Sequence, residues 1–250
     1  MRGWMCNAMR TYLSKKLISV SSGDHLRQSL SEIDIKYLTR KQDRTPAHEE
    51  LWTVCRFLSA LSDDAVLPYP IEVVHQDRPD FLLVCNAEKI GIEVTRATHP
   101  DYAWALALAE EVDGGLVECS LYRPTVNAKR PERGTRPPVT SINRSLRAAG
   151  WRGLQPERDW VQFICGAVEA KSAKLLENVR YDHDWLLVRD ATPCKTVLHY
   201  REAVPMLERE LSDYWLRSER FSSIFVLSGG NVFEFSPSGT RHGTVVELWS

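Results

Sequence analysis

The spacing of apolar residues predicts alternating helices and strands from residue 45 onward. Thr45 is a good N-cap residue, and Pro46 suits the first position of a helix. Behind them, apolar residues recur at helical spacing at Leu51, Val54, Leu58 and Leu61. We therefore expect a helix that ends near residue 62.

Three short apolar runs follow, at residues 71–75, 80–85 and 90–95, and each is typical of a strand. The polar tetrad at 86–89 joins the last two runs, which favours a β-hairpin. After Thr98 the pattern changes to an Ala- and Leu-rich helix that Asp101 can cap and that stops at Gly114 and Gly115.

The remaining pattern completes an α/β fold. After residues 123–158, which read as irregular, it predicts these elements: a helix at 160–179, a strand at 185–189, a helix at 202–217, and strands at 221–227, 231–235 and 243–249. With residues 99–159 set aside as an insertion, the order helix, strand, strand, strand, helix, strand predicts a mixed β-sheet flanked by helices. Residues 1–44, with one helix expected at 24–38, form an N-terminal extension to a domain at 45–250.

Composition narrows the functional classes. Lys and Arg number 32 against 33 Asp and Glu, so nucleic-acid binding would need a local basic patch rather than a global excess. The six cysteines lie far apart without zinc-ligand spacing, which suggests buried thiols in a reducing compartment. The longest apolar run near the N-terminus is too short for a signal peptide or a membrane span. We therefore expect a cytoplasmic protein without a membrane partner; the sequence does not indicate an oligomeric state.

A local basic patch does occur, inside the insertion. Its candidate phosphate-binding side chains are Lys129, Arg130, Arg133, Arg136, Arg144 and Arg147. Tyr122 and Trp151 flank this segment and would suit stacking on bases. A solvated basic loop remains the alternative.

Two carboxylates stand in otherwise apolar strands. Asp80 opens one strand of the expected hairpin, and Glu93 lies inside its partner, on the same strand face as Thr95. Burying two unpaired carboxylates close together is costly unless a cation neutralises both. A divalent metal with hard oxygen ligands, Mg²⁺ or Mn²⁺, would serve and could present water to a phosphodiester.

These residues resemble the PD-(D/E)xK nuclease superfamily, which has a restriction-endonuclease-like fold. Pro79 and Asp80 match its "PD", Glu93 matches the acidic residue of its "(D/E)xK", and the order of elements agrees over residues 45–98 and 160–190. The resemblance implies that Asp80 and Glu93 bind the metal, together with the backbone carbonyl of Val94. It also implies a possible further acid from the first helix, for which Glu50 is a better candidate than Glu49.

Thr95 stands where the family has lysine, and a hydroxyl cannot supply a positive charge. Lys171 is the candidate replacement, because it falls in the apolar stripe of the helix at 160–179 with Ile164, Val168 and Leu175, whereas Lys174 is expected to face solvent. Thr95 would then assist by hydrogen bonding.

The sequence therefore predicts a metal-dependent nuclease that hydrolyses phosphodiester bonds in DNA or RNA, with DNA favoured as the partner. The alternative is a catalytically inactive nuclease-like module that binds nucleic acid or a protein partner. For single residues, the alternatives are a turn-capping role for Asp80, a Glu93–Arg96 ion pair, a snorkelling Lys171 and a solvated Glu50.

Overall fold

The computed structural model describes seven stretches of the chain: residues 14–35, 45–62, 67–86, 88–109, 117–124, 150–175 and 180–249. Within them, one sheet holds eight strands in sequence order. Neighbouring strands are antiparallel except at the centre, where β4 pairs in parallel with β5 and β5 with β6. The expected α/β class with a mixed sheet is thus confirmed.

The strands are β1 (Lys15–Val20), β2 (Ile71–His75), β3 (Phe81–Cys85), β4 (Glu88–Ala97), β5 (His183–Asp190), β6 (Ser223–Ser228), β7 (Asn231–Ser236) and β8 (Gly239–Thr244). The antiparallel pairing of β3 with β4 confirms the predicted hairpin. Short runs of alternating burial define β2 and β3, whereas the central strands β5 and β6 are buried almost throughout because helices and loops cover both faces.

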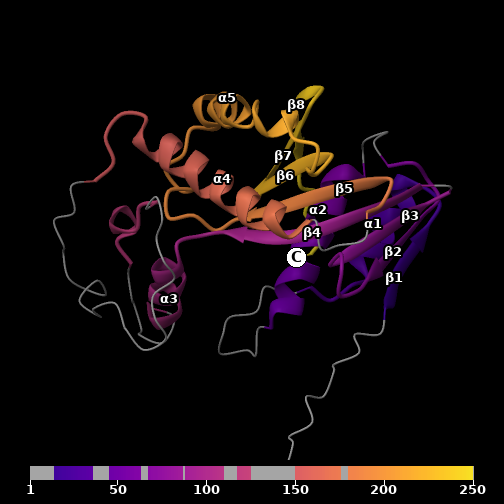
Figure 1. Cartoon of the computed structure of the whole chain (residues 1–250). Helices are drawn as coiled ribbons and strands as arrows, with labels where there is room; N and C mark the ends of the chain where they lie inside the picture. Colours follow the sequence, from indigo (N-terminus) through magenta and orange to yellow (C-terminus); the bar gives the residue numbers. More distant parts are fainter. Residues whose placement is uncertain are drawn as a thin grey trace, which may run out of the picture.

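Helices cover the two faces of the sheet, as Figure 1 shows. The helices are α1 (Gly23–Ser31), α2 (Pro46–Leu61), α3 (Pro100–Ala109), α4 (Gln155–Leu175) and α5 (Tyr200–Glu210), with 3-10 turns at Cys119–Leu121 and Tyr214–Leu216. Apolar residues of α1 and α2 pack on one face, in a core around Phe57 and Ile92. Those of α4 and α5 pack on the other face, around Trp160 and Leu186. None of the described helices is long and apolar enough to cross a membrane.

The local sequence explains where α2 begins. The hydroxyl of Thr45 accepts a hydrogen bond from the backbone N–H of His48, and the imidazole of His48 accepts one from the backbone N–H of Thr45. This capping box, with Pro46 behind it, fixes the first turn of the helix. The two glutamates of that first part of α2, Glu49 and Glu50, are thereby held over the sheet near β4.

Both ends of the sheet differ from the sequence-based expectation. Residues 15–31 lie in the predicted extension, yet they supply β1, which pairs with β2, and α1, whose Leu26 and Leu30 are buried in the core. The last strand is Gly239–Thr244 and not 243–249, because the polar residues at 239–244 pair with β7 on an edge where they face solvent. Short polar edge strands carry little hydrophobic pattern, so sequence periodicity does not find them.

One irregularity of the sheet positions the candidate site. The β3–β4 ladder begins with Phe81 opposite Ile92, whereas β4 continues to Ala97. Among the described residues, no strand pairs with Glu93–Ala97 on the β3 side. The second half of β4 therefore has an open edge between the α2 face and the α4 face.

We predict that α1 is integral to the fold. Replacing the fully buried Leu26 with Ala should lower the free energy of unfolding by about 2–5 kcal/mol, because it leaves a cavity beside β1 and α2. Leu216→Ala is the matched control: this leucine is 83% exposed, so its change should stay within about 0.5 kcal/mol. Urea denaturation measures both; equal, small effects would show that residues 15–31 do not stabilise the domain.

Candidate functional site

The carboxylate of Asp80 forms a hydrogen bond with the backbone of β4 at its open edge. The register of the hairpin, continued by one residue beyond Phe81 and Ile92, places Asp80 beside Glu93 on the same side of the sheet. The backbone N–H of Val94 donates a hydrogen bond of 2.6 Å to Oδ2 of Asp80. The carboxylate therefore replaces the ladder partner that β3 no longer supplies, and the end of β3 fixes Asp80 relative to Glu93.

Lys171 brings a positive charge to these two carboxylates. Its Nζ atom donates a hydrogen bond of 2.7 Å to Oε2 of Glu93 and lies 3.7 Å from Oδ2 of Asp80. The lysine extends from α4, in the stripe that also buries Ile164 and Val168 against the sheet, whereas Lys174 is exposed. The sheet and α4 thus bring together three of the residues that the sequence singles out, and Glu93 has Lys171 as an ionic partner.

A third carboxylate approaches from the other face. Glu50 on α2 is half-buried, and its Oε2 lies 3.8 Å from Nε2 of His75 at the end of β2. Glu50 also interacts electrostatically with both Lys171 and Glu93. The open edge of β4 permits this, because no strand in the described part of the chain separates α2 from the α4 side at that point.

The electrostatics show an excess of negative charge. Burial raises the pKa of Asp80 to about 6, helped by repulsion from Glu93 and Glu50 and opposed by Lys171 and the Val94 hydrogen bond. Burial likewise raises the pKa of Glu50; the charge of Lys171 opposes this rise and the charge of Glu93 adds to it. Burial on its own would lower the pKa of Lys171, but attraction to Asp80, Glu93 and Glu50 outweighs burial and raises it. One ammonium does not compensate three carboxyl groups.

Within the described residues, no group of three or more Cys, His, Asp or Glu side chains is arranged to hold a metal ion. The geometry instead provides a pair, Asp80 and Glu93, that already shares a cation. Mg²⁺ commonly binds through one or two carboxylates and completes its shell with water and substrate phosphate, so a pair is sufficient for a site that also holds substrate. The backbone carbonyl of Val94, the further ligand implied by resemblance, belongs to the same edge.

A pocket of about 600 Å³ lies next to this cluster. Its lining includes Glu50, Val94 and Thr95 together with Glu49, Arg96 and Arg189. Thr95 is therefore at the pocket, on the open part of β4.

Sequence reasoning does not identify the charged network of this pocket. Oε2 of Glu49 lies 3.3 Å from a guanidinium nitrogen of Arg96 and 3.5 Å from one of Arg189. The Glu93–Arg96 pair considered from sequence is thus replaced by pairs of Arg96 with Glu49 and of Glu93 with Lys171. Alternation along β4 puts Arg96 and Glu93 on opposite faces and so argues against a pair between them, but it does not indicate Glu49 or Arg189 as partners.

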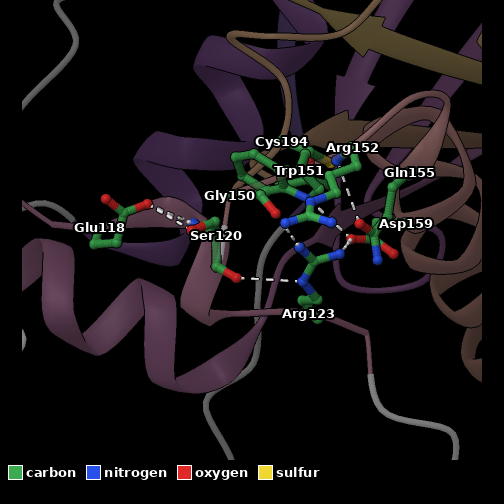
Figure 2. Close-up of polar contacts among 10 residues, drawn as sticks. Glu118, Ser120, Arg123, Gly150, Trp151, Arg152, Gln155, Asp159 and Cys194 are labelled. Carbon is green, nitrogen blue, oxygen red and sulfur yellow. Dashed lines mark hydrogen bonds and ion pairs between the residues drawn. The ribbon is translucent and has the colours of Figure 1, made fainter. Parts of the chain in front are cut away.

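The six basic residues predicted to contact phosphate, Lys129, Arg130, Arg133, Arg136, Arg144 and Arg147, lie outside the described residues. The chain on either side of them is described, and Figure 2 shows how the two sides meet at Arg123. Its guanidinium donates to the backbone carbonyls of Ser120 and Gly150 and to the carboxylate of Asp159 on α4. Arg123 therefore ties the chain before the basic segment to the chain after it.

The two aromatic residues that flank the basic segment are already engaged. Tyr122 is buried and packs against His99 and Tyr102. The indole N–H of Trp151 donates to Asp159 at 2.9 Å, and the guanidinium of Arg123 lies 5.8 Å from the centre of its ring. The expectation that these side chains are open platforms for bases is therefore wrong for Tyr122, and Trp151 serves the same cluster as Arg123 (Figure 2).

Comparison of the chain with protein-family models, with curated proteins and with solved structures finds no match.

We predict a pH-dependent stability caused by Asp80. A carboxyl group whose pKa is raised on folding stabilises the fold in its protonated form; this contribution is complete below about pH 4 and is lost as the pH rises through about 6. The free energy of unfolding of Asp80→Asn minus that of the parent should therefore increase by about 2 kcal/mol between about pH 4 and pH 7.

Urea denaturation in the presence of a chelator measures this difference. The control is Asp213→Asn, which changes an exposed aspartate away from the cluster. If the difference for Asp80→Asn varies with pH no more than the difference for this control, the crowded carboxylate cluster is contradicted.

Proposed function

We propose that the protein is a metal-dependent nuclease with a restriction-endonuclease-like fold. The observation that carries the proposal is the position of Lys171 between Asp80 and Glu93, where β4 continues past the first residue of β3. This position supports the resemblance to the PD-(D/E)xK superfamily. This chain has Thr95 in place of the motif lysine, and Lys171 on α4 supplies a lysine to the same two carboxylates.

The residues fit a divalent cation. Asp80 and Glu93 offer hard carboxylate oxygens to a shared positive charge, and Glu50 adds negative charge that Lys171 alone does not balance. Asp80 and Glu93 would hold Mg²⁺ or Mn²⁺, with the carbonyl of Val94. When bound, such an ion supplies charge neutralisation at the scissile phosphate and makes water more acidic.

The chain's own residues then orient the reactants of phosphodiester hydrolysis. Lys171 has a raised pKa, so it is protonated near neutral pH and acts as a hydrogen-bond donor rather than as a base. In that form it positions the attacking water and the phosphate oxygens. The hydroxyl of Thr95, on the open part of β4, can donate a further hydrogen bond to the same phosphate.

A nucleic acid is the substrate that the surroundings favour. Among the described residues the edge of β4 is open to a ligand, and two arginines, Arg96 on β4 and Arg189 on β5, line the adjacent pocket. The segment 125–149 adds six basic side chains by sequence.

The competing function, an inactive module that binds nucleic acid or a protein partner, is motivated by Thr95 at the lysine position. The contact of Lys171 with Glu93 weakens the case for an inactive module, because a lysine ammonium group is present at the carboxylates. Metal and nucleic-acid binding without cleavage would favour the module.

We predict metal-dependent cleavage that depends on the cluster. In Mg²⁺ or Mn²⁺, Asp80→Asn, Glu93→Gln and Lys171→Met should each lower the rate by about 100-fold or more, because each removes charge stabilisation or positioning at the phosphate. Gel assays on plasmid, single-stranded DNA and RNA measure the rate.

The matched controls are Lys174→Met, on the exposed side of the same helix, and Asp213→Asn; both should cut like the parent. Equal cutting by all variants would contradict the assignment of these three residues to the active site. A parent protein that does not cut would favour the inactive binding module.

We predict that Mn²⁺ affinity distinguishes the metal ligands, Asp80 and Glu93, from the positioning residue, Lys171. Asp80→Asn and Glu93→Gln should weaken Mn²⁺ binding at least about tenfold, because each deletes a charged ligand. Lys171→Met should bind Mn²⁺ as tightly as the parent or more tightly, because the ammonium competes for the same carboxylates. Titration calorimetry measures the affinities; weakened binding by Lys171→Met comparable with that of Asp80→Asn would contradict these roles.

A further inference from the structure

Asp80 is the last residue of the turn between β2 and β3, so this turn sets where its carboxylate lies. The backbone N–H of Gln76 donates a hydrogen bond of 3.1 Å to the backbone carbonyl of Asp80. Nε2 of Gln76 donates another, of 3.2 Å, to the backbone carbonyl of Arg78 inside the turn. Pairing of β3 with β4 begins only at the next residue, Phe81. The contacts of the turn therefore decide how firmly the backbone of Asp80 is held.

Tyr181, just before β5, reaches this turn at a place that β4 leaves empty. By alternation, Gly91 of β4 faces the same side of the sheet as Glu93, but it carries no side chain. A Cβ atom on Gly91 would lie 2.8 Å from Cδ2 of Tyr181 and 3.2 Å from Cγ of Pro79. The rings of Tyr181 and Pro79 therefore share the space over Gly91. Because Pro79 directly precedes Asp80, the tyrosine ring lies beside the part of the turn that carries the carboxylate.

The hydroxyl of Tyr181 makes a second contact with the turn. Nε2 of Gln76, which binds the carbonyl of Arg78, also donates to the hydroxyl oxygen of Tyr181 at 3.4 Å. A side-chain amide carries two N–H donors, so Gln76 can serve both acceptors. The bond to the hydroxyl is long, so the ring supplies more of the contact than the oxygen does. A phenylalanine at this position should therefore hold the turn almost as well.

Asp184 on β5 fixes the backbone of Tyr181. Its Oδ1 accepts a hydrogen bond of 3.4 Å from the backbone N–H of Tyr181, and its Oδ2 lies 2.7 Å from Nε of Arg180. Asp184 is itself buried and pairs with Gly91 in the parallel register. Tyr181 is thus held on the strand next to β4, and its ring extends over β4 to the turn. It links β5 to the turn that carries Asp80.

We infer that Tyr181 is a positioning residue of the candidate site, which holds the turn between β2 and β3 so that the carboxylate of Asp80 stays at the open edge of β4. There the carboxylate accepts the hydrogen bond of Val94 and lies 3.7 Å from Nζ of Lys171. The inference rests on the proposed function only for the metal that Asp80 would then bind. The position of the carboxylate can be measured by itself.

A merely structural tyrosine would cover Gly91 without affecting the position of Asp80. Its loss would then lower the thermal stability and leave the site unchanged. The two contacts with the turn argue against this role, because they involve Pro79, which precedes Asp80, and Gln76, which binds its carbonyl.

The hydrogen bond between Val94 and Asp80 tests the inference without metal or substrate. NMR on the isotope-labelled, full-length protein in a chelator should detect a scalar coupling across this short bond, between the amide nitrogen of Val94 and the carboxyl carbon of Asp80. Tyr181→Leu should abolish or clearly reduce the coupling, because a loosened turn lengthens the bond. Tyr181→Phe keeps the ring and should keep the coupling.

Mn²⁺ affinity gives a second readout. By titration calorimetry, Tyr181→Leu should raise the Kd for Mn²⁺ about tenfold or more, because a residue that orients a metal ligand commonly contributes that much to affinity. Tyr181→Phe should bind Mn²⁺ like the parent. The matched control is Tyr102→Leu, which removes another partly buried tyrosine, on the helix that follows the far end of β4, and should change neither readout.

The outcomes separate this inference from the proposed function. If Tyr181→Leu is folded and keeps the coupling of the parent, Tyr181 only covers Gly91 and the inference is overturned, whatever the metal affinity. It is also overturned if the parent shows no coupling, or if Tyr181→Phe loses it as Tyr181→Leu does. If the coupling is lost in Tyr181→Leu alone but the parent does not bind Mn²⁺, the positioning role stands and the metal site of the proposed function is rejected.

A second variant decides if thermal melts show that Tyr181→Leu does not fold. In Gly91→Ala, the added Cβ atom would lie 2.8 Å from the tyrosine ring, so the ring must move away from the turn. This variant should weaken the same coupling and the Mn²⁺ affinity in the same direction. A Gly91→Ala protein with the coupling of the parent would then overturn the inference.

Discussion

The crowding of carboxylates at the point where β3 begins is the constraint on which the rest of the site depends. Asp80 must lie there because it accepts the Val94 N–H that has lost its ladder partner, and the hairpin register then sets Glu93 beside it. Two such groups, partly buried, repel each other, and the pKa of Asp80 rises to about 6 as a result of burial and that repulsion. A positive charge is needed, and Lys171 provides only part of it.

The open edge of β4 brings the two faces of the sheet together at the candidate site. From Glu93 onward the strand alternates between the α4 face, where Lys171 lies, and the α2 face, where Arg96 meets Glu49. In a fully paired sheet these faces would be separate surfaces. Among the residues that the structure describes, they meet along an edge of a few residues, so the carboxylate cluster and the network of Glu49 lie on the two faces of one strand.

Local patterns predicted much of this arrangement, and long-range contacts account for the rest. Asp80 and Glu93 stand out because charges interrupt apolar strands, and the helical stripe of α4 indicates Lys171. The network of Glu49 with Arg96 and Arg189 joins three elements far apart in the chain, and no local spacing reveals it. For the same reason periodicity does not find β1, a strand whose partner lies more than 50 residues away.

A crystal structure of the protein grown with Mn²⁺ near neutral pH tests the central claim most directly. The account predicts an anomalous peak within about 2.0–2.3 Å of carboxylate oxygens of both Asp80 and Glu93, with Lys171 displaced from its position between them. The account is contradicted if Lys171 still occupies that position and no ion is found there at a saturating concentration of Mn²⁺.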